Sequence, residues 1–216
     1  MQVIDLTAPI NKNIQCYPTD PPFRKAWHTR FEDAGTWVSK LEMGAHAGTH
    51  VDAPLHFLER GSDIAGMPVD RFFGEAIAID SPKSPGDNVL PQDLSGADIR
   101  EGDIVLFHTG WEGRANSPRF FEGEWPGFTP ETVDALIAKK VKAIGGDIAS
   151  ADSPKEIAGG APAHKRAMAA GLPIFEALVN VHRVVGRRFC FLGLPLRIEG
   201  VEASPIRAIA LLDWNP

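Results

Sequence analysis

Cysteine is scarce in this chain of 216 residues, and its scarcity argues against two kinds of scaffold. Cys16 and Cys190 are the only two cysteines, they lie far apart in the sequence, and neither belongs to a Cys-x-x-Cys pair. A disulfide framework and a zinc site built from cysteine ligands are therefore both disfavoured.

Long apolar runs and an excess of basic charge are also missing. No stretch approaches the roughly 20 apolar residues that span a membrane, and Met1–Leu6 has no basic start followed by an apolar run, so a cytoplasmic protein is the default expectation. With 28 acidic and 22 basic residues the net charge is −6. Neither a nucleic acid nor an anionic membrane is therefore an expected partner.

Two common catalytic motifs are absent as well. The sequence contains no Gly-x-Ser-x-Gly, so hydrolysis by a Ser–His–Asp triad has no support. It contains no glycine-rich phosphate-binding motif either.

The composition is that of a globular protein rich in loops. Hydrophobic residues make up 44% of the chain and charged residues 23%, which is typical of soluble domains. The length favours one domain covering residues 1–216 over two small ones. The 21 glycines and 18 prolines predict many loops, where functional sites are usually built.

Local patterns predict both strands and helices. Thr129 and Pro130 are typical of a helix N-cap and first position, and a second helix is expected over Ala163–Ala170, ending at Gly171. Strand, helix and strand from 104 to 145 indicate an α/β or α+β domain with a mixed sheet. Five short apolar runs predict buried strands, namely 76–79, 104–108, 141–145, 189–192 and 206–212.

A cluster of histidines is the main candidate for a functional site. His46, His50 and His56 are three of only seven histidines, and together with Asp52 they all occupy even positions. In an extended chain residues of one parity share a face, and Gly48 adds no bulk between them. The surrounding glycines, proline and β-branched residues disfavour a helix here, and no His-Glu-x-x-His motif is present.

The spacing within this cluster leaves alternatives open. In an ideal strand His46 and His50 would lie about 13 Å apart, so either Gly48 bends the segment or the site holds two ions. Imidazole and carboxylate together suit Zn, Mn, Fe, Co or Ni rather than Ca or Mg. The alternative reading is a polar strand face, or histidines that only form hydrogen bonds in a loop.

The segment from His46 to Phe57, HAGTHVDAPLHF, resembles the signature of the metal-dependent cyclase family, which includes bacterial kynurenine formamidases and isatin hydrolases. The similarity extends to Val3–Thr7, to Ile144–Asp147 and to Ala203–Ala208, which look like the opening, central and closing segments of the family. It implies a swivelling β/β/α fold with a mixed, barrel-like core and flanking helices. Family members are usually dimers or tetramers, so a homodimer or homotetramer is expected.

The resemblance also implies the rest of the site. His164 and Glu176, twelve positions apart, match the family's remaining metal-binding pair, and Asp52 and Glu176 could bridge two ions. Glu176 resembles the two-zinc formamidase version, so Zn²⁺ is the first choice, and Mn²⁺, which the resemblance to the isatin hydrolases implies, is the alternative. The implied metal ligands are His46, His50, Asp52, His164 and Glu176, and His56 matches the catalytic histidine.

The implied activity is hydrolysis of a small amide, either an aryl formamide or a cyclic amide. A divalent ion lowers the pKa of a bound water from about 15.7 toward 7, and His56 could act as general acid and base. A lactone hydrolase or a dehydrating cyclase could use the same centre. A metal-binding subunit without catalysis is the alternative from another class, although His56 would then have no purpose.

Other polar residues carry weaker hypotheses. Asp147 and Asp152 follow a predicted strand and could support the site, although capping of a loop is the favoured role. His108 could line a pocket or simply hydrogen-bond in a loop, and His28 and His182 carry no functional prediction.

Aromatic residues in the loops could wall a pocket for a flat substrate. They could equally pack loops or form an oligomer interface. The candidates are Trp27, Trp37, Trp111, Phe120, Phe121 and Trp125. The segment Tyr17-Pro18-Thr19-Asp20 corresponds to a formamidase loop that usually reads Trp-Pro-Gly-Asp, and this departure weakens the case for N-formylkynurenine as substrate.

Overall fold

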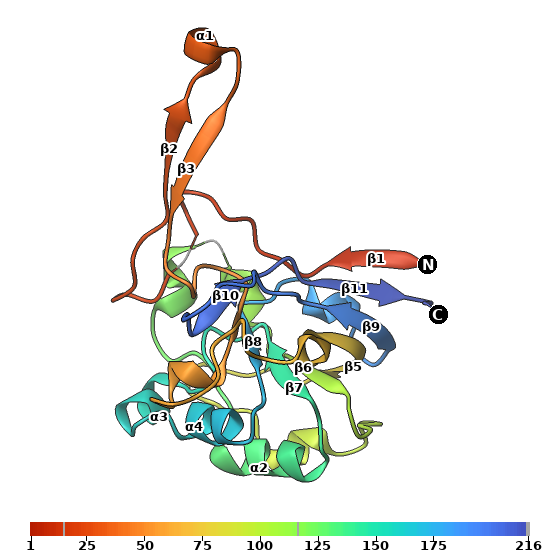
Figure 1. The fold of residues 1–216 in the computed structure, drawn as a ribbon. Coiled ribbons are helices and arrows are strands. Elements are labelled where there is room, and N and C mark those ends of the chain that lie inside the picture. The colour runs from red at the N-terminus through yellow and green to blue at the C-terminus, as the bar shows by residue number, and fades with distance from the viewer. Residues whose placement is uncertain (15, 116, 215–216) are drawn as a thin grey trace.

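The computed structural model describes residues 1–14, 16–115 and 117–214 (Figure 1). Its body is a mixed sheet of nine strands in the order β1-β11-β9-β5-β6-β7-β8-β4-β10. Strands β5 to β8 run parallel to one another, and the other pairs are antiparallel. The strands are β1 (Gln2–Asp5), β4 (His50–Asp52), β5 (Phe73–Asp80), β6 (Ile104–His108), β7 (Ala143–Gly146), β8 (Ile174–Glu176), β9 (Arg188–Leu192), β10 (Ala203–Pro205) and β11 (Ile209–Leu212).

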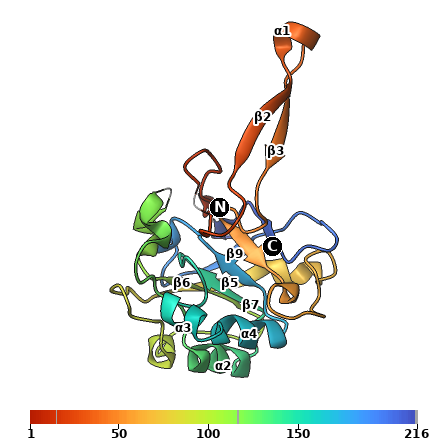
Figure 2. The same ribbon diagram turned by 90° about the vertical axis from the view of Figure 1, so that its left-hand side faces the viewer.

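Three α-helices cover one face of this sheet (Figure 2): α2 (Pro130–Ala138), α3 (Pro154–Ala158) and α4 (Pro162–Ala169). The predicted start of α2 is confirmed, because the Thr129 side chain accepts a hydrogen bond from the Thr132 amide and Pro130 is the first helical residue. Helix α4 begins one residue before the prediction and ends one residue early. Short 3₁₀ turns occupy Pro54–His56, Val69–Phe72, Pro91–Leu94, Trp111–Arg114, Pro118–Phe121 and Val181–Arg183.

Apolar side chains fill both faces of the sheet. On β6, Ile104 and Leu106 join the core on one face, while Val105 and Phe107 join the core under the helices. This alternation follows from the two-residue period of a strand. Burying a side chain such as Phe107 stabilises the fold by about 1.5–3 kcal/mol.

The sheet is strongly curled. The sequence predicts one strand over the apolar run 206–212, and this prediction is wrong in its first part, because only β11 forms within the run and residues 206–208 connect it to β10. Strand β10 pairs with β4 at one end of the sheet, whereas β11 pairs with β9 and β1 near the other. Only residues 206–208 separate them, so the two ends must approach each other. The predicted barrel-like core with flanking helices is thereby confirmed.

A separate two-stranded hairpin projects from the body (Figures 1 and 2). Its strands are β2 (Arg24–Thr29) and β3 (Val38–Glu42), joined through the short helix α1 (Phe31–Ala34). Residues 24–42 are called the arm below.

Among the described residues, no helix has both the length and the apolar character needed to cross a membrane.

Candidate metal centre

Two adjacent strands present polar side chains to the helix-covered side of the sheet. In the antiparallel pair β4–β8, His50 lies opposite Glu176, and their Nε2 and Oε2 atoms are 3.5 Å apart. Val51 and Phe175, the alternate residues, belong to the apolar core on the other face. The even-position pattern therefore holds along β4 and directs His50 and Asp52 to one face.

His46 reaches the same place because the chain turns before β4. Gly48 has a φ of +67°, and a Cβ added there would lie 2.7 Å from Cδ1 of Ile14. The predicted bend at Gly48 is thus confirmed, and the His46 and His50 rings are 5.0 Å apart between centroids. Nδ1 of His50 is 2.7 Å from the carbonyl oxygen of Gly48, which leaves its Nε2 facing the carboxylates.

Asp52 is the centre of the cluster and has no exposed surface. Its Oδ1 lies 2.9 Å from Nδ1 of His46 and 3.3 Å from Nε2 of His50. Its Oδ2 lies 3.6 Å from Nε2 of His164. Neither oxygen has a hydrogen-bond partner within the described part of the chain. Asp52 therefore faces His46 and His50 with one carboxylate oxygen and His164 with the other.

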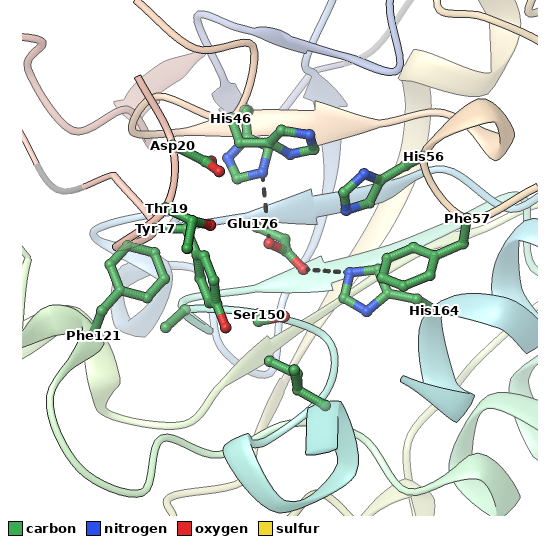
Figure 3. Close-up of a pocket in the computed structure, with 13 residues that line it drawn as sticks. Tyr17, Thr19, Asp20, His46, His56, Phe57, Phe121, Ser150, His164 and Glu176 are labelled. Carbon is green, nitrogen blue, oxygen red and sulfur yellow. Dashed lines mark ion pairs between the residues drawn. The ribbon is translucent and has the colours of Figure 1, made fainter. Parts of the chain in front are cut away.

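The C-terminal half supplies the other side of the cluster. His164, on α4, has its Nε2 3.2 Å from Oε1 of Glu176, and Figure 3 shows Glu176 between His164 and the histidines of the N-terminal segment. The same Oε1 accepts a hydrogen bond of 2.6 Å from the amide of Ala151. Two side chains that no local pattern selects are thus brought to the N-terminal motif by the β4–β8 pairing and by α4.

Asp152 fixes the orientation of His164. Its Oδ2 is 2.6 Å from Nδ1 of His164 and accepts the amide of the same residue at 2.9 Å, while its Oδ1 accepts the amide of Ala163. The carboxylate therefore both caps the start of α4 and leaves Nε2 of His164 free to bind. The sequence favoured only the cap, and the structure shows both contacts.

His56 lies at the end of the 3₁₀ turn that follows β4. Its ring is 4.3 Å from that of His46 and 5.7 Å from that of His164, between centroids. The nitrogen and oxygen atoms of His46, Asp52 and His56 lie within 4.8 Å of one another, as do those of His50, Asp52 and Glu176. All six residues singled out in the sequence are therefore together, and His56 lies close enough to contact an ion as well as a substrate.

Buried carboxylates make the cluster favourable for positive charge. Burial by itself would lower the pKa of His46, but the charge of Asp52, supported by Glu176 and Glu202, raises it to about 9. Burial would raise the pKa of Asp52, but its histidine neighbours hold it well below its usual range.

The pKa values of His56 and His164 are shifted in opposite directions. Burial is the main cause that lowers the pKa of His56 to about 4; Asp52 opposes this effect, and the positive charges of His46 and His164 add to it. Burial opposes protonation of His164 too, yet the neighbouring carboxylates of Asp152, Asp52 and Glu176 raise its pKa well above the usual value.

The donor atoms fit a divalent transition-metal ion. Buried atoms without a hydrogen-bond partner among the described residues include Nε2 of His46, Nε2 of His50 and both carboxylate oxygens of Asp52. Buried polar atoms are normally paired, so a group of unpaired nitrogen and oxygen donors is well suited to bind a cation. A mixture of imidazole and carboxylate is the donor set of zinc, manganese and related ions.

A cavity of about 270 Å³ opens onto this cluster. Tyr17 and Phe121 form part of its wall (Figure 3), and their rings meet edge to face with 5.6 Å between centroids. The other lining residues outside the cluster are Thr19, Asp20, Phe57, Ala149, Ser150 and Ile157.

The loop aromatics divide into three groups. Phe121 lines the cavity, which is one of the roles that the sequence left open. Trp111, Phe120 and Trp125 are buried in a cluster behind it and pack loops. The other two tryptophans, Trp27 and Trp37, lie on the arm and not at the cavity.

The remaining candidates outside the cluster have local partners. Asp147 caps a loop, accepting hydrogen bonds from the amides of Thr109, Gly110 and Glu112 and from the Thr109 hydroxyl. His108 is 2.7 Å from Asp80 and does not line the cavity. His182 pairs with Glu112, and His28 is exposed on the arm.

Asp152→Asn is expected to weaken metal binding by about 10–100-fold, the usual cost of losing the partner that orients a ligating histidine. The amide cannot provide the same charged acceptor to Nδ1 of His164. Titration with zinc against a chromogenic chelator measures the change. Asp147→Asn is the matched control, because Asp147 is equally buried and has no hydrogen bond to a histidine. Equal losses in both variants would contradict the role of Asp152.

Known proteins resemble the chain along nearly its whole length. A family model described as "Putative cyclase" matches residues 4–153. The kynurenine formamidase of Salinibacter ruber is 30% identical and 97% of each chain is covered; that of Bacillus mycoides is 31% identical, with 96% of each covered.

Solved structures show the same architecture. Isatin hydrolase A from Ralstonia solanacearum superimposes with a TM-score of 0.89 at 25% identity, covering 98% of this chain and 92% of the other. A structure described as a potential metal-dependent hydrolase with cyclase activity gives a TM-score of 0.81 at 28% identity, covering 100% and 99%.

Proposed function

Because this chain belongs to the cyclase family, we propose that it is a metal-dependent hydrolase that cleaves a non-peptide C–N bond in an aryl formamide or a cyclic amide. One observation carries the proposal: the histidines and carboxylates of two distant segments meet at the floor of a cavity with aromatic walls. The ligands come from both halves of the chain, which supports the proposal that residues 1–216 act as one domain.

The proposed metal ligands are those that the resemblance implied: His46, His50, Asp52, His164 and Glu176. The two oxygens of Asp52 face different histidines, which supports a bridging carboxylate and two ions. We favour Zn²⁺ because position 176 holds a carboxylate, and Mn²⁺ is the alternative.

Such an ion supplies an activated water and polarises the substrate carbonyl when it is bound. His56, beside the ligands, would take the proton of the attacking water at a ring nitrogen and return it to the leaving nitrogen. Tyr17 and Phe121 would pack against the ring of the substrate and exclude water from one side.

The charge of the cavity supports a substrate without a negatively charged group. Asp20 is part of the lining, and no lysine or arginine is found among the described lining residues. A carboxylate on the substrate would therefore meet no lysine or arginine side chain, so we favour uncharged aryl formamides and lactams.

Removal of the metal is expected to abolish turnover, and zinc or manganese is expected to restore it. A panel of aryl formamides, with and without a ring carboxylate, together with isatin-like lactams and lactones, identifies the substrate class. Removal of a ligand that binds only the folded state also lowers Tm, which gives a second readout. Stoichiometric metal without turnover on any member of the panel would favour a binding subunit, and turnover of lactones alone would favour ester hydrolysis.

We also propose that the chain forms a homodimer or a homotetramer. The presence of a long exposed arm supports self-association.

A further inference from the structure

Three polar groups in the wall of the cavity have no partner in the protein. The carboxylate of Asp20 and the hydroxyls of Tyr17 and Ser150 belong to lining residues, and none of these groups has a hydrogen bond or an ion pair within the described part of the chain. Ser150 is only 8% exposed, and Tyr17 and Asp20 are half-buried. Polar groups in such places are normally paired, so all three are available to a molecule that enters the cavity.

These groups lie away from the proposed proton carrier. Figure 3 shows Tyr17 and Asp20 on one side of Glu176 and His56 on the other. Tyr17 and Asp20 belong to one turn, because the amide of Asp20 donates a hydrogen bond of 2.8 Å to the carbonyl oxygen of Tyr17. A substrate whose amide lies between the metal centre and His56 would therefore extend its far end toward this turn.

Packing holds Tyr17 in place. Its ring meets those of Phe121 and Trp125 edge to face, with 5.6 and 6.5 Å between centroids. Trp125 in turn donates a hydrogen bond from its indole Nε1 to the carbonyl oxygen of Asp152, two residues after Ser150. The wall is thus continuous from the turn of Tyr17 to the loop of Ser150, and an entering ring meets a surface that is already formed.

The chemistry of the three groups favours a hydrogen-bond donor on the substrate. An ionised carboxylate accepts hydrogen bonds and donates none, whereas a hydroxyl does both. An O–H or N–H group on the substrate therefore satisfies Asp20, and a group that only accepts, such as a methyl ether, leaves it unpaired. A site built to pair with a polar group discriminates strongly against an analogue that lacks this group.

The size of the cavity restricts the rest of the substrate. Its volume is about 270 Å³, below the range of about 300–1,000 Å³ that is typical of pockets for drug-sized ligands. Such a space suits one aromatic ring with short substituents. The polar group that reaches Asp20 is then a small one attached to the ring itself.

We propose that Asp20, assisted by the hydroxyls of Tyr17 and Ser150, selects substrates whose aromatic ring carries a hydroxyl or amino group. This inference rests on the proposed function and adds a substrate class to it, namely hydroxyaryl and aminoaryl formamides and lactams with the same ring substituents. These compounds are uncharged, which agrees with a cavity whose described lining has no lysine or arginine. Asp20 binds the substrate and takes no part in the cleavage.

Matched formanilides test the proposal on the metal-loaded protein. Hydroxy and methoxy substituents have similar electronic effects, so a pair with the substituent at the same ring position differs mainly in the hydrogen-bond donor. For at least one ring position, the wild type is expected to show a kcat/KM about 10–100-fold higher for the hydroxy member, the range for a hydrogen bond to a charged group. Amino and dimethylamino pairs are expected to behave in the same way.

Variants assign this preference to its residues. Asp20→Asn is expected to lower the ratio of the two kcat/KM values at least about 10-fold, and Tyr17→Phe and Ser150→Ala, which each remove one neutral hydroxyl, about 2–10-fold. Asp87→Asn is the matched control, because Asp87 is exposed and lies outside the cavity, and it should keep the wild-type ratio. A preference that survives in Asp20→Asn would overturn the proposal.

Binding of the product anilines gives a readout that does not depend on turnover. In calorimetry, meta-aminophenol is expected to bind to the metal-loaded protein at least about 10-fold more tightly than meta-methoxyaniline, and Asp20→Asn is expected to remove this difference. This binding difference without turnover of any formanilide would contradict the proposed function and still support Asp20 as the recognition residue. Equal binding, together with equal kcat/KM for every hydroxy and methoxy pair, would overturn the inference.

Discussion

Asp52→Ala is expected to release the metal and to lower turnover by at least about 1,000-fold, because the pKa of the attacking water returns toward 15.7 without the ion. Asp52 is wholly buried, and its two oxygens face His46 and His50 on one side and His164 on the other. Its loss removes the proposed bridge together with the negative charge that compensates three imidazoles. We expect a larger loss than for any other single carboxylate.

Metal content measured by mass spectrometry on the purified protein checks this result. Asp52→Asn keeps the shape of the side chain and removes its charge, so it separates loss of charge from loss of packing. The expected order of metal affinity is wild type, then Asp152→Asn, then the two Asp52 variants. An Asp52→Ala protein that folds and keeps stoichiometric metal would contradict the assignment of Asp52 as a ligand.

Part of this centre could be read from the sequence because its geometry is local. His50 and Asp52 lie on a real strand, so the two-residue period places both on one face. The same argument fails for His46, where the positive φ of Gly48 replaces the strand by a turn. The glycine itself was the signal that the segment bends.

His164 and Glu176 could not be found in this way. Their place in the cluster depends on the pairing of β8 with β4 and on the position of α4 over that side of the sheet, and no local pattern encodes either contact. Only the resemblance to a family pointed to them. For the same reason the sequence could suggest that Asp152 supports the site but not that it contacts His164, because this contact depends on where α4 begins.

The elements of the fold were likewise predictable where they depend on adjacent residues and not where they depend on distant contacts. The helix at Thr129 and the strand 104–108 were predictable because a capping residue and an apolar run act on adjacent residues. The run 206–212 is mostly apolar, yet only its second part forms a strand, β11, and the chain just before it forms β10 at the other end of the sheet. Periodicity reports that a segment is buried and not which strand it pairs with, so the break was not visible.

His56→Ala is expected to keep the metal and to lower kcat by about 10²–10⁴-fold, the usual contribution of a general acid and base. The residue lines the cavity, and its ring lies beside that of His46. If its role is proton transfer, added imidazole should restore part of the turnover in the variant, which a purely structural role would not allow. His108→Ala is the matched control, because that histidine lies outside the cavity and should change neither metal content nor kcat.

The same variant decides between two readings of the geometry. Because the donor atoms of His46, Asp52 and His56 lie within 4.8 Å of one another, His56 is near enough to be a ligand. A ligand and a proton carrier differ in what their loss removes: the first takes the ion with it, whereas the second leaves the ion and stops the chemistry. Equal metal loss in His56→Ala and Asp52→Ala would therefore place His56 among the ligands, and retained metal with imidazole rescue would establish it as the proton carrier.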